Sequence, residues 1–127
     1  NIEAPGLSSA TCYAFHPTLP FLFYNNGNEV YVYDMSTQSA QRVVTLGAGE
    51  KISMLKFNKL RGAGHNDTSV TQLQYKLAVG SVAPDAEVGN EGILRFYDVP
   101  EFADVLTQYG VTYTGFGVIK DIAYKER

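Results

Sequence analysis

The sequence predicts an all-β, antiparallel fold: about two blades of a β-propeller, followed by the first strand of a third blade. Nine Tyr and seven Phe accompany short runs of Val, Ile and Thr that are broken by Gly, Asn and Asp, a composition typical of strands and tight turns. An apolar strand ending in Tyr-Asp occurs twice, as EVYVYDM at 29–35 and as GILRFYDVP at 92–100. This repeat, and a spacing near forty residues, indicates successive blades.

Nine strands are expected from the apolar runs between turn residues. The Asn26-Gly27 pair supplies the positive φ angles that a tight hairpin needs between the second and third strands. The expected strands are residues 10–15, 21–25, 29–34, 41–46, 51–57, 73–82, 93–98, 111–114 and 118–124.

One segment has a helical pattern. Phe102, Val105, Leu106 and Tyr109 follow Pro100 at helical spacing, and Gly110 ends the run. These features predict a short helix there.

The blade boundaries follow from three strand ends that correspond. Phe15 and Phe57 are 42 positions apart (57 − 15), the length of a four-stranded blade, whereas Tyr124 follows after 67 (124 − 57). The excess lies in two polar loop insertions, 59–72 and 83–92. Within a single all-β fragment, 1–127, we expect a first blade at 10–46, a second blade at 51–114 and a closing strand at 118–124.

The strands are apolar on both faces, as stacked blades require. In EVYVYD the alternating sets Val30/Val32 and Tyr31/Tyr33 are both apolar, which predicts burial from two sides. Two blades cannot close a propeller, so we expect either further N-terminal blades or self-association. A β-sandwich is the alternative fold.

The charge and composition of the chain argue against several classes of binding partner and cofactor. The net charge is −3 and the ten Lys and Arg are scattered, so nucleic acid is not an expected partner. No apolar run is long enough to cross a bilayer as a helix. Cys12 and two distant histidines do not form a zinc pattern, and we expect no cofactor.

Four motifs carry a family resemblance: GEKISMLKFN at 49–58, LAVGS at 77–81, EGILRFYDV at 91–99 and GFGVIKDIAYKER at 115–127. Together they resemble the C-terminal propeller part of PKD-like family lipoproteins, which accompany starch-utilisation-type outer-membrane uptake systems. More broadly, the repeat resembles WD40 and YVTN-like propellers, without the Gly-His dipeptide of WD40 blades. The resemblance implies a cell-surface protein, lipid-anchored to the outer membrane through a missing N-terminal part, with glycans or uptake-system proteins as partners.

Two sets of residues are candidate sites. Sugar rings stack on aromatic side chains, and the ligand-binding candidates are Tyr13, Tyr24, Tyr75, Tyr109 and Tyr113. Oxygen ligands alternate in the second insertion, as in calcium loops but without the EF-hand spacing, and the metal candidates are Asp85, Glu87, Asn90 and Glu91.

No catalytic motif is present, and we expect a protein that is not an enzyme. The leading hypothesis is a non-catalytic binding or scaffold segment of a surface lipoprotein engaged in glycan or nutrient capture. An intracellular protein-interaction propeller and a fragment of a propeller enzyme are the alternatives.

Overall fold

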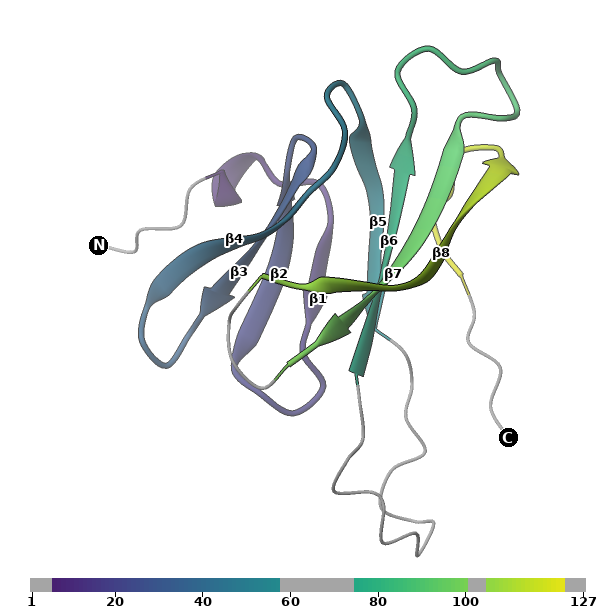
Figure 1. Cartoon of the computed structure of the whole chain (residues 1–127). Coiled ribbons are helices and arrows are strands. Elements are labelled where there is room, and N and C mark those ends of the chain that lie inside the picture. The colour runs from purple at the N-terminus through teal and green to yellow at the C-terminus, as the bar shows by residue number, and fades with distance from the viewer. Residues whose placement is uncertain (1–5, 58–74, 101–104, 123–127) are drawn as a thin grey trace, which may run out of the picture.

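The computed structural model describes residues 6–57, 75–100 and 105–122. It confirms the all-β, antiparallel prediction: the described residues form two four-stranded sheets, each made of four consecutive strands in chain order (Figure 1). A three-residue 3-10 helix, η1 (Leu7–Ser9), precedes them.

The first sheet contains β1 (Tyr13–Phe15), β2 (Phe21–Asn26), β3 (Glu29–Asp34) and β4 (Ser39–Thr45). Each strand pairs antiparallel with the next strand in the chain, and a short connection joins the two. Gly27, at φ 65°, makes the predicted tight turn between β2 and β3. Asp34 closes the turn after β3, because its Oδ1 accepts hydrogen bonds from the Ser36 N–H and hydroxyl.

The second sheet contains β5 (Lys51–Phe57), β6 (Tyr75–Val82), β7 (Gly92–Val99) and β8 (Thr107–Phe116). It repeats the up-and-down order of the first sheet. The pairing of β7 with β8 shifts twice, and Gly110 and Gly115 of β8 have φ angles of 77° and 90°.

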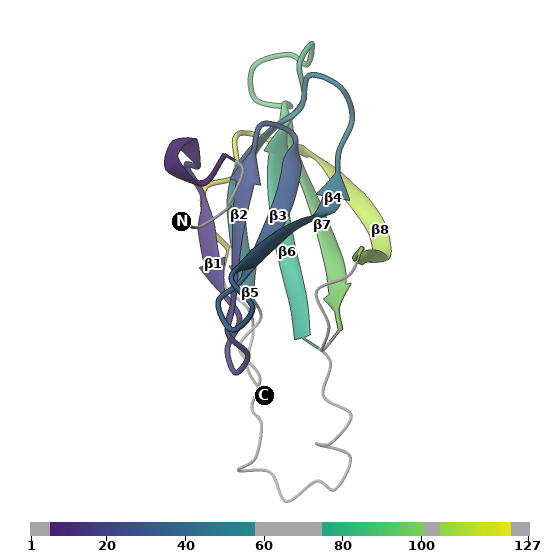
Figure 2. The ribbon, with the colours of Figure 1, turned by 90° about the vertical axis from the view of Figure 1, so that its left-hand side faces the viewer.

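The two sheets face one another as two layers (Figure 2). Their facing side chains form one hydrophobic core, with Phe23 and Val32 from the first sheet and Leu77 and Val79 from the second at its centre. The first strands, β1 and β5, lie against each other. Burial of this apolar surface is the main source of stability.

Two sequence predictions were wrong. Residues 107–110 belong to β8 and not to a helix, because Tyr109 pairs with Phe96 of β7. The predicted closing strand at 118–124 is not a strand over its described residues, 118–122. There the Ile119 carbonyl accepts a hydrogen bond from the Ser53 hydroxyl, so a side chain, and not a neighbouring strand, holds the segment.

Most of the other boundaries are close to those expected, but the strand expected at 111–114 runs from Thr107 to Phe116. The first strand is shorter than predicted, because the N–H groups of Thr11 and Cys12 donate to the Asn25 side chain in place of a strand partner. The loop insertion at 59–72 lies outside the described residues. Within the described residues, no helix is long and apolar enough to span a membrane.

Candidate functional site

The two sheets place corresponding residues in identical rows. Directly paired residues on neighbouring strands share a face, so Phe15, Leu22 and Tyr33 form one row across β1–β3. Phe57, Leu77 and Tyr97 form the matching row across β5–β7. The alternate rows also match: Ala14–Phe23–Val32 in the first sheet, Lys56–Ala78–Phe96 in the second.

The matching rows do not have the same surroundings. The Phe57 row packs into the core against the first sheet, with the Phe57 ring 5.3 Å from that of Phe23. The Phe15 row lies on the face of the first sheet that is turned away from the core, and Phe15 is 62% exposed. The first sheet therefore turns the Phe15 row outward, whereas the second sheet turns the alternate row, Lys56–Ala78–Phe96, outward.

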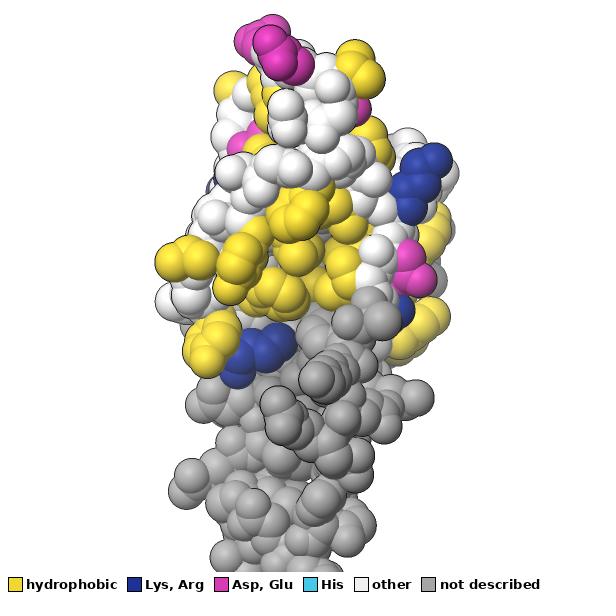
Figure 3. Space-filling model, turned by 90° about the vertical axis from the view of Figure 1, so that its right-hand side faces the viewer, with side chains coloured by type: hydrophobic (Ala, Val, Ile, Leu, Met, Phe, Trp, Pro, Cys, Tyr) yellow, Lys and Arg dark blue, Asp and Glu magenta, His cyan; other side chains and the backbone are white. Residues whose placement is uncertain are grey.

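The outward face of the second sheet gathers exposed aromatic rings. We call Leu94, Phe96, Tyr109 and Tyr113 the aromatic face; Leu94 pairs with Tyr113 and Phe96 with Tyr109. The ring of Tyr113 stands edge-on to Phe96, with centroids 6.1 Å apart. Tyr109 is 56% exposed and Tyr113 46%. Figure 3 shows apolar side chains clustered on this side of the molecule.

Charged side chains at one end of the aromatic face are paired. The Lys76 ammonium lies 2.8 Å from the Asp98 carboxylate and 4.5 Å from the centre of the Tyr109 ring. Asp98 is the repeat counterpart of Asp34 and pairs with a lysine, whereas Asp34 accepts hydrogen bonds in the turn after β3. This end of the aromatic face is electrically balanced.

Residues 118–122 cover the other half of the same face. The side chain of Ile119 lies against Gly80, next to Met54. The Lys56 ammonium bridges to the Asp121 carboxylate at 2.8 Å and donates to the Ile122 carbonyl. This described segment therefore lies over β5 and β6, and not over β7 and β8.

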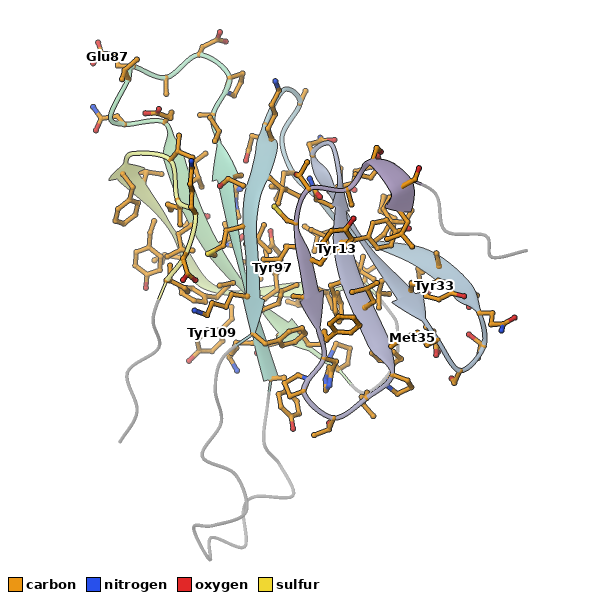
Figure 4. The ribbon with its side chains drawn as sticks, turned by 180° about the vertical axis from the view of Figure 1, so that it is seen from behind. Tyr13, Tyr33, Met35, Glu87, Tyr97 and Tyr109 are labelled. Atoms are coloured by element: carbon orange, nitrogen blue, oxygen red, sulfur yellow. The ribbon has the colours of Figure 1, made fainter. Side chains whose placement is uncertain are left out.

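The β6–β7 loop, residues 83–91, carries the acidic candidates. Glu87 lies at the outer tip of this loop (Figure 4), and Asp85, Glu87 and Asn90 are exposed. The Glu91 carboxylate accepts a hydrogen bond from the Gly89 N–H at 2.5 Å, and the Asn90 N–H donates to the Glu87 carbonyl. Across the described part of the chain, no group of three His, Cys, Asp or Glu residues could hold a metal ion.

The remaining predicted tyrosines lie apart from the aromatic face. Tyr24 is completely buried and stacks on Tyr31 at 5.7 Å, and burial raises its pKa to about 12. Tyr13 is half exposed on the outer face of the first sheet, where its hydroxyl donates to the Ala10 carbonyl. Tyr75 packs against His16 at 4.5 Å. Only Tyr109 and Tyr113 are brought together.

A buried ion pair holds the β4–β5 connection, which joins the two sheets, against β7. The Arg95 guanidinium donates to the Glu50 carboxylate, which also accepts from the Ser81 hydroxyl and the Gly47 N–H. Burial acts to raise the pKa of Glu50, but the hydrogen bonds from Arg95 and Ser81 outweigh it and hold the pKa below its usual value. The pair lies between the sheets, away from the aromatic face.

Sequence reasoning missed Leu94, Phe96 and Lys76 as members of this face. The signal was the alternation in β7, where Leu94 and Phe96 face one side and Arg95 and Tyr97 the other. No known family model, curated protein or solved structure matches this chain.

Proposed function

We propose that this chain is a non-catalytic binding or scaffold module: two successive propeller blades of a surface lipoprotein that captures a glycan or another nutrient. The observation that carries the proposal is the pair of matching rows, Phe15–Leu22–Tyr33 and Phe57–Leu77–Tyr97. Matching rows across the first three strands of consecutive four-stranded sheets are what a repeated blade requires.

The strand connections favour blades over a sandwich. Sandwiches commonly use Greek-key connections that carry the chain between sheets. Here the chain completes β1–β4 before it begins β5–β8. The contact between β1 and β5 also suits blades, whose first strands lie nearest the propeller axis.

In this proposal the ligand contacts the β6–β7 loop. Loops that exceed the length of a tight turn are often functional. In this loop the side chains of Asp85, Glu87 and Asn90 are exposed to solvent. Carboxylate and amide oxygens accept hydrogen bonds from sugar hydroxyls. The lipid anchor, the outer-membrane location and the uptake-system partners are proposed on the motif resemblance.

Isothermal titration with a panel of starch-derived and other short oligosaccharides tests the proposal. We expect one oligosaccharide class to bind, and Glu87→Ala combined with Asp85→Ala to weaken that binding at least tenfold. The matched control is Glu29→Ala, which removes an acidic group on β3 and should leave binding unchanged. If no oligosaccharide binds, or if the double variant binds as tightly as the parent, glycan capture through this loop is wrong.

A further inference from the structure

We propose that the aromatic face is a stacking platform for a neutral oligosaccharide, whose sugar units lie with their apolar faces against the rings of Tyr109 and Tyr113. The inference rests on the proposed function, because it identifies a second contact of the same ligand, beyond the β6–β7 loop. In this arrangement the rings supply the apolar contact and the loop supplies hydrogen bonds.

The two tyrosines present their rings on the same face of one sheet. Both belong to β8, the last strand of the second sheet, where Tyr109 pairs with Phe96 and Tyr113 with Leu94. Residues two apart on a strand point to the same face, and directly paired residues share a face. The two pairs are separated by about 7 Å along β7. Two rings therefore stand next to each other as platforms for successive sugar units.

Contacts within the chain hold both rings in place, although about half of each side chain is exposed. The Lys76 ammonium lies 4.5 Å from the centre of the Tyr109 ring. The Phe96 ring stands edge-on to that of Tyr113, with centroids 6.1 Å apart. A side chain that is already held loses less rotational freedom when a ligand binds. The two rings are therefore pre-organised for stacking.

The charges around the face favour a ligand without charge. No charged residue occurs from 105 to 119. The charged side chains beside the face pair within the chain, Lys76 with Asp98 and Lys56 with Asp121, both at 2.8 Å. A charged ligand would have to break into these pairs to replace the hydration that it loses on binding. A neutral ligand rich in hydroxyl groups has no such requirement.

Uncharged hydrogen-bonding groups accompany the rings along β8. Thr112 and Thr114 flank Tyr113 in the sequence, and both are exposed. The Gln108 amide donates to the Thr112 hydroxyl at 2.8 Å. A hydroxyl group both donates and accepts, so threonine and tyrosine side chains can pair with sugar hydroxyls of either orientation. This mixture of rings and hydroxyl groups suits a sugar better than a purely apolar partner.

The aromatic face adjoins the loop to which the proposed function assigns the ligand. Gly92 follows the loop directly and begins β7. Leu94, the partner of Tyr113, lies about 7 Å along the strand from Gly92, and Phe96, the partner of Tyr109, about 14 Å. A single sugar is too short to touch the loop and both rings, whereas an extended oligosaccharide can. We therefore expect affinity to rise with the length of the oligosaccharide.

Calorimetric titration of single variants tests the platform. The probes are the neutral chains maltohexaose, cellohexaose and xylohexaose, with hexagalacturonate as an anionic counterpart. We expect a neutral chain to bind the parent, and Tyr109→Ala and Tyr113→Ala each to weaken that binding roughly tenfold. Tyr109→Phe and Tyr113→Phe keep the ring and should bind nearly as tightly as the parent.

The matched control is Tyr13→Ala. It removes a tyrosine ring that is 49% exposed on the first sheet and should leave the affinity unchanged. Because Tyr109 and Tyr113 are themselves 56% and 46% exposed, their alanine variants should keep the thermal unfolding curve of the parent.

Nuclear magnetic resonance of the parent chain gives a second reading that needs no alanine variant. With ring-labelled tyrosine, assigned through the phenylalanine variants, the bound neutral chain should shift the signals of Tyr109 and Tyr113. The signal of Tyr24, which is buried against Tyr31, should stay in place. A shift confined to Tyr13, or no shift at any tyrosine while the chain binds, overturns the platform.

The remaining outcomes separate this inference from the proposed function. If a neutral chain binds the parent and both alanine variants equally, the platform is wrong while glycan capture stands. If both alanine variants weaken binding and the Asp85–Glu87 double variant does not, the platform is supported and the loop contact is wrong. If no neutral chain binds the parent, the platform is wrong, and glycan capture then depends on hexagalacturonate or another charged chain.

Two further results would assign the face to a different partner. Hexagalacturonate binding as tightly as the neutral chains would contradict a neutral ligand. A mass by light scattering above the 13.9 kDa of one chain, which Tyr109→Ala returns to that value, would show that the face contacts a second copy. Either result overturns the inference.

Discussion

Arg95 donates two hydrogen bonds to the Glu50 carboxylate, at 2.9 Å to Oε1 and 3.3 Å to Oε2, and so ties the β4–β5 connection to β7. The two side chains are only 17% and 10% exposed. An ion pair this far from solvent is costly to break from one side, because the remaining charge stays buried.

Arg95→Ala should therefore lower the free energy of unfolding by roughly 3 kcal/mol, measured by urea denaturation. Arg42→Ala is the control: it breaks a pair with Glu29 in which the arginine is 57% exposed, and it should cost less than about 1 kcal/mol. Equal losses of unfolding free energy in the two variants would contradict a larger stabilisation by the buried Glu50–Arg95 pair.

At acidic pH, protonation of Glu50 should remove the contribution of its carboxylate to the free energy of unfolding. The hydrogen-bonded carboxylate has a folded pKa below its ordinary value of 4.5, so the unfolded chain takes up the proton first as pH falls. The stabilisation is complete above about pH 4.5 and is lost below it, as pH falls through the folded pKa. Glu50→Gln should be less stable at pH 7 and should show a flatter decline between pH 4.5 and 3 in urea titrations at each pH.

His16 should add a second, higher acid-sensitive range. Its Nδ1 accepts hydrogen bonds from the N–H groups of Thr18 and Leu19, at 3.1 and 3.0 Å, and its ring packs among Phe21, Phe57 and Tyr75. Burial lowers its pKa below 6.5. The neutral ring therefore stabilises the fold fully above pH 6.5, and that contribution is lost as pH falls through the folded pKa.

The test is His16→Asn, because an amide oxygen can accept the same two N–H groups without titrating. We expect the unfolding free energy of this variant to be constant from pH 6.5 to 5, where the parent declines. If the parent shows no decline in that range, or if the variant declines equally, His16 is not the titrating group.

Gly92→Ala should disrupt the pairing of β7 with β8. A Cβ at residue 92 would overlap the carbonyl oxygen of Gly117, so the chain after β8 would have to move. We expect a loss of roughly 1–3 kcal/mol in unfolding free energy, measured by thermal unfolding. Gly117→Ala is the matched control, since nothing lies within 4 Å of a Cβ there; a larger loss for the control would refute this explanation.

Asn25→Ala should loosen the chain before β1. The Asn25 Oδ1 accepts from the N–H groups of Thr11 and Cys12, at 2.8 and 2.9 Å, and its Nδ2 donates to the Thr11 hydroxyl. Losing these partners should cost roughly 1–3 kcal/mol, with faster amide exchange at Thr11 and Cys12. Asn25→Asp keeps the acceptor and should lose less, so an equal loss would argue against the two backbone contacts.

The strands were readable from the sequence because their signals are local. The Asn26-Gly27 turn and the run of Val and Tyr at 30–33 specify a hairpin wherever it lies in the fold. The helix expected at Phe102 to Tyr109 does not form over its described residues, 105–109, because its signal was too short to decide the structure. Leu106 instead enters the core, where its N–H donates to the Val43 carbonyl, and Tyr109 pairs with β7.

The candidate site was only partly predictable. Five tyrosines could be named as possible sugar platforms, but the sequence gives no information on the face that each ring occupies. Tyr24 is buried against Tyr31, whereas Tyr109 and Tyr113 lie together beside Phe96. That difference depends on neighbours from other strands.

By itself, the sequence determined most of the strands, their alternation and their repetition, because backbone preference and side-chain period are properties of short segments. Only the tertiary structure decided which faces are covered. Phe15 and Phe57 end corresponding strands and occupy the same place in identical rows, yet Phe57 packs into the core and Phe15 is 62% exposed. The reason is that the burial of a side chain depends on what packs against its face of the sheet. The first sheet covers Phe57, whereas no described residue covers Phe15 to the same extent.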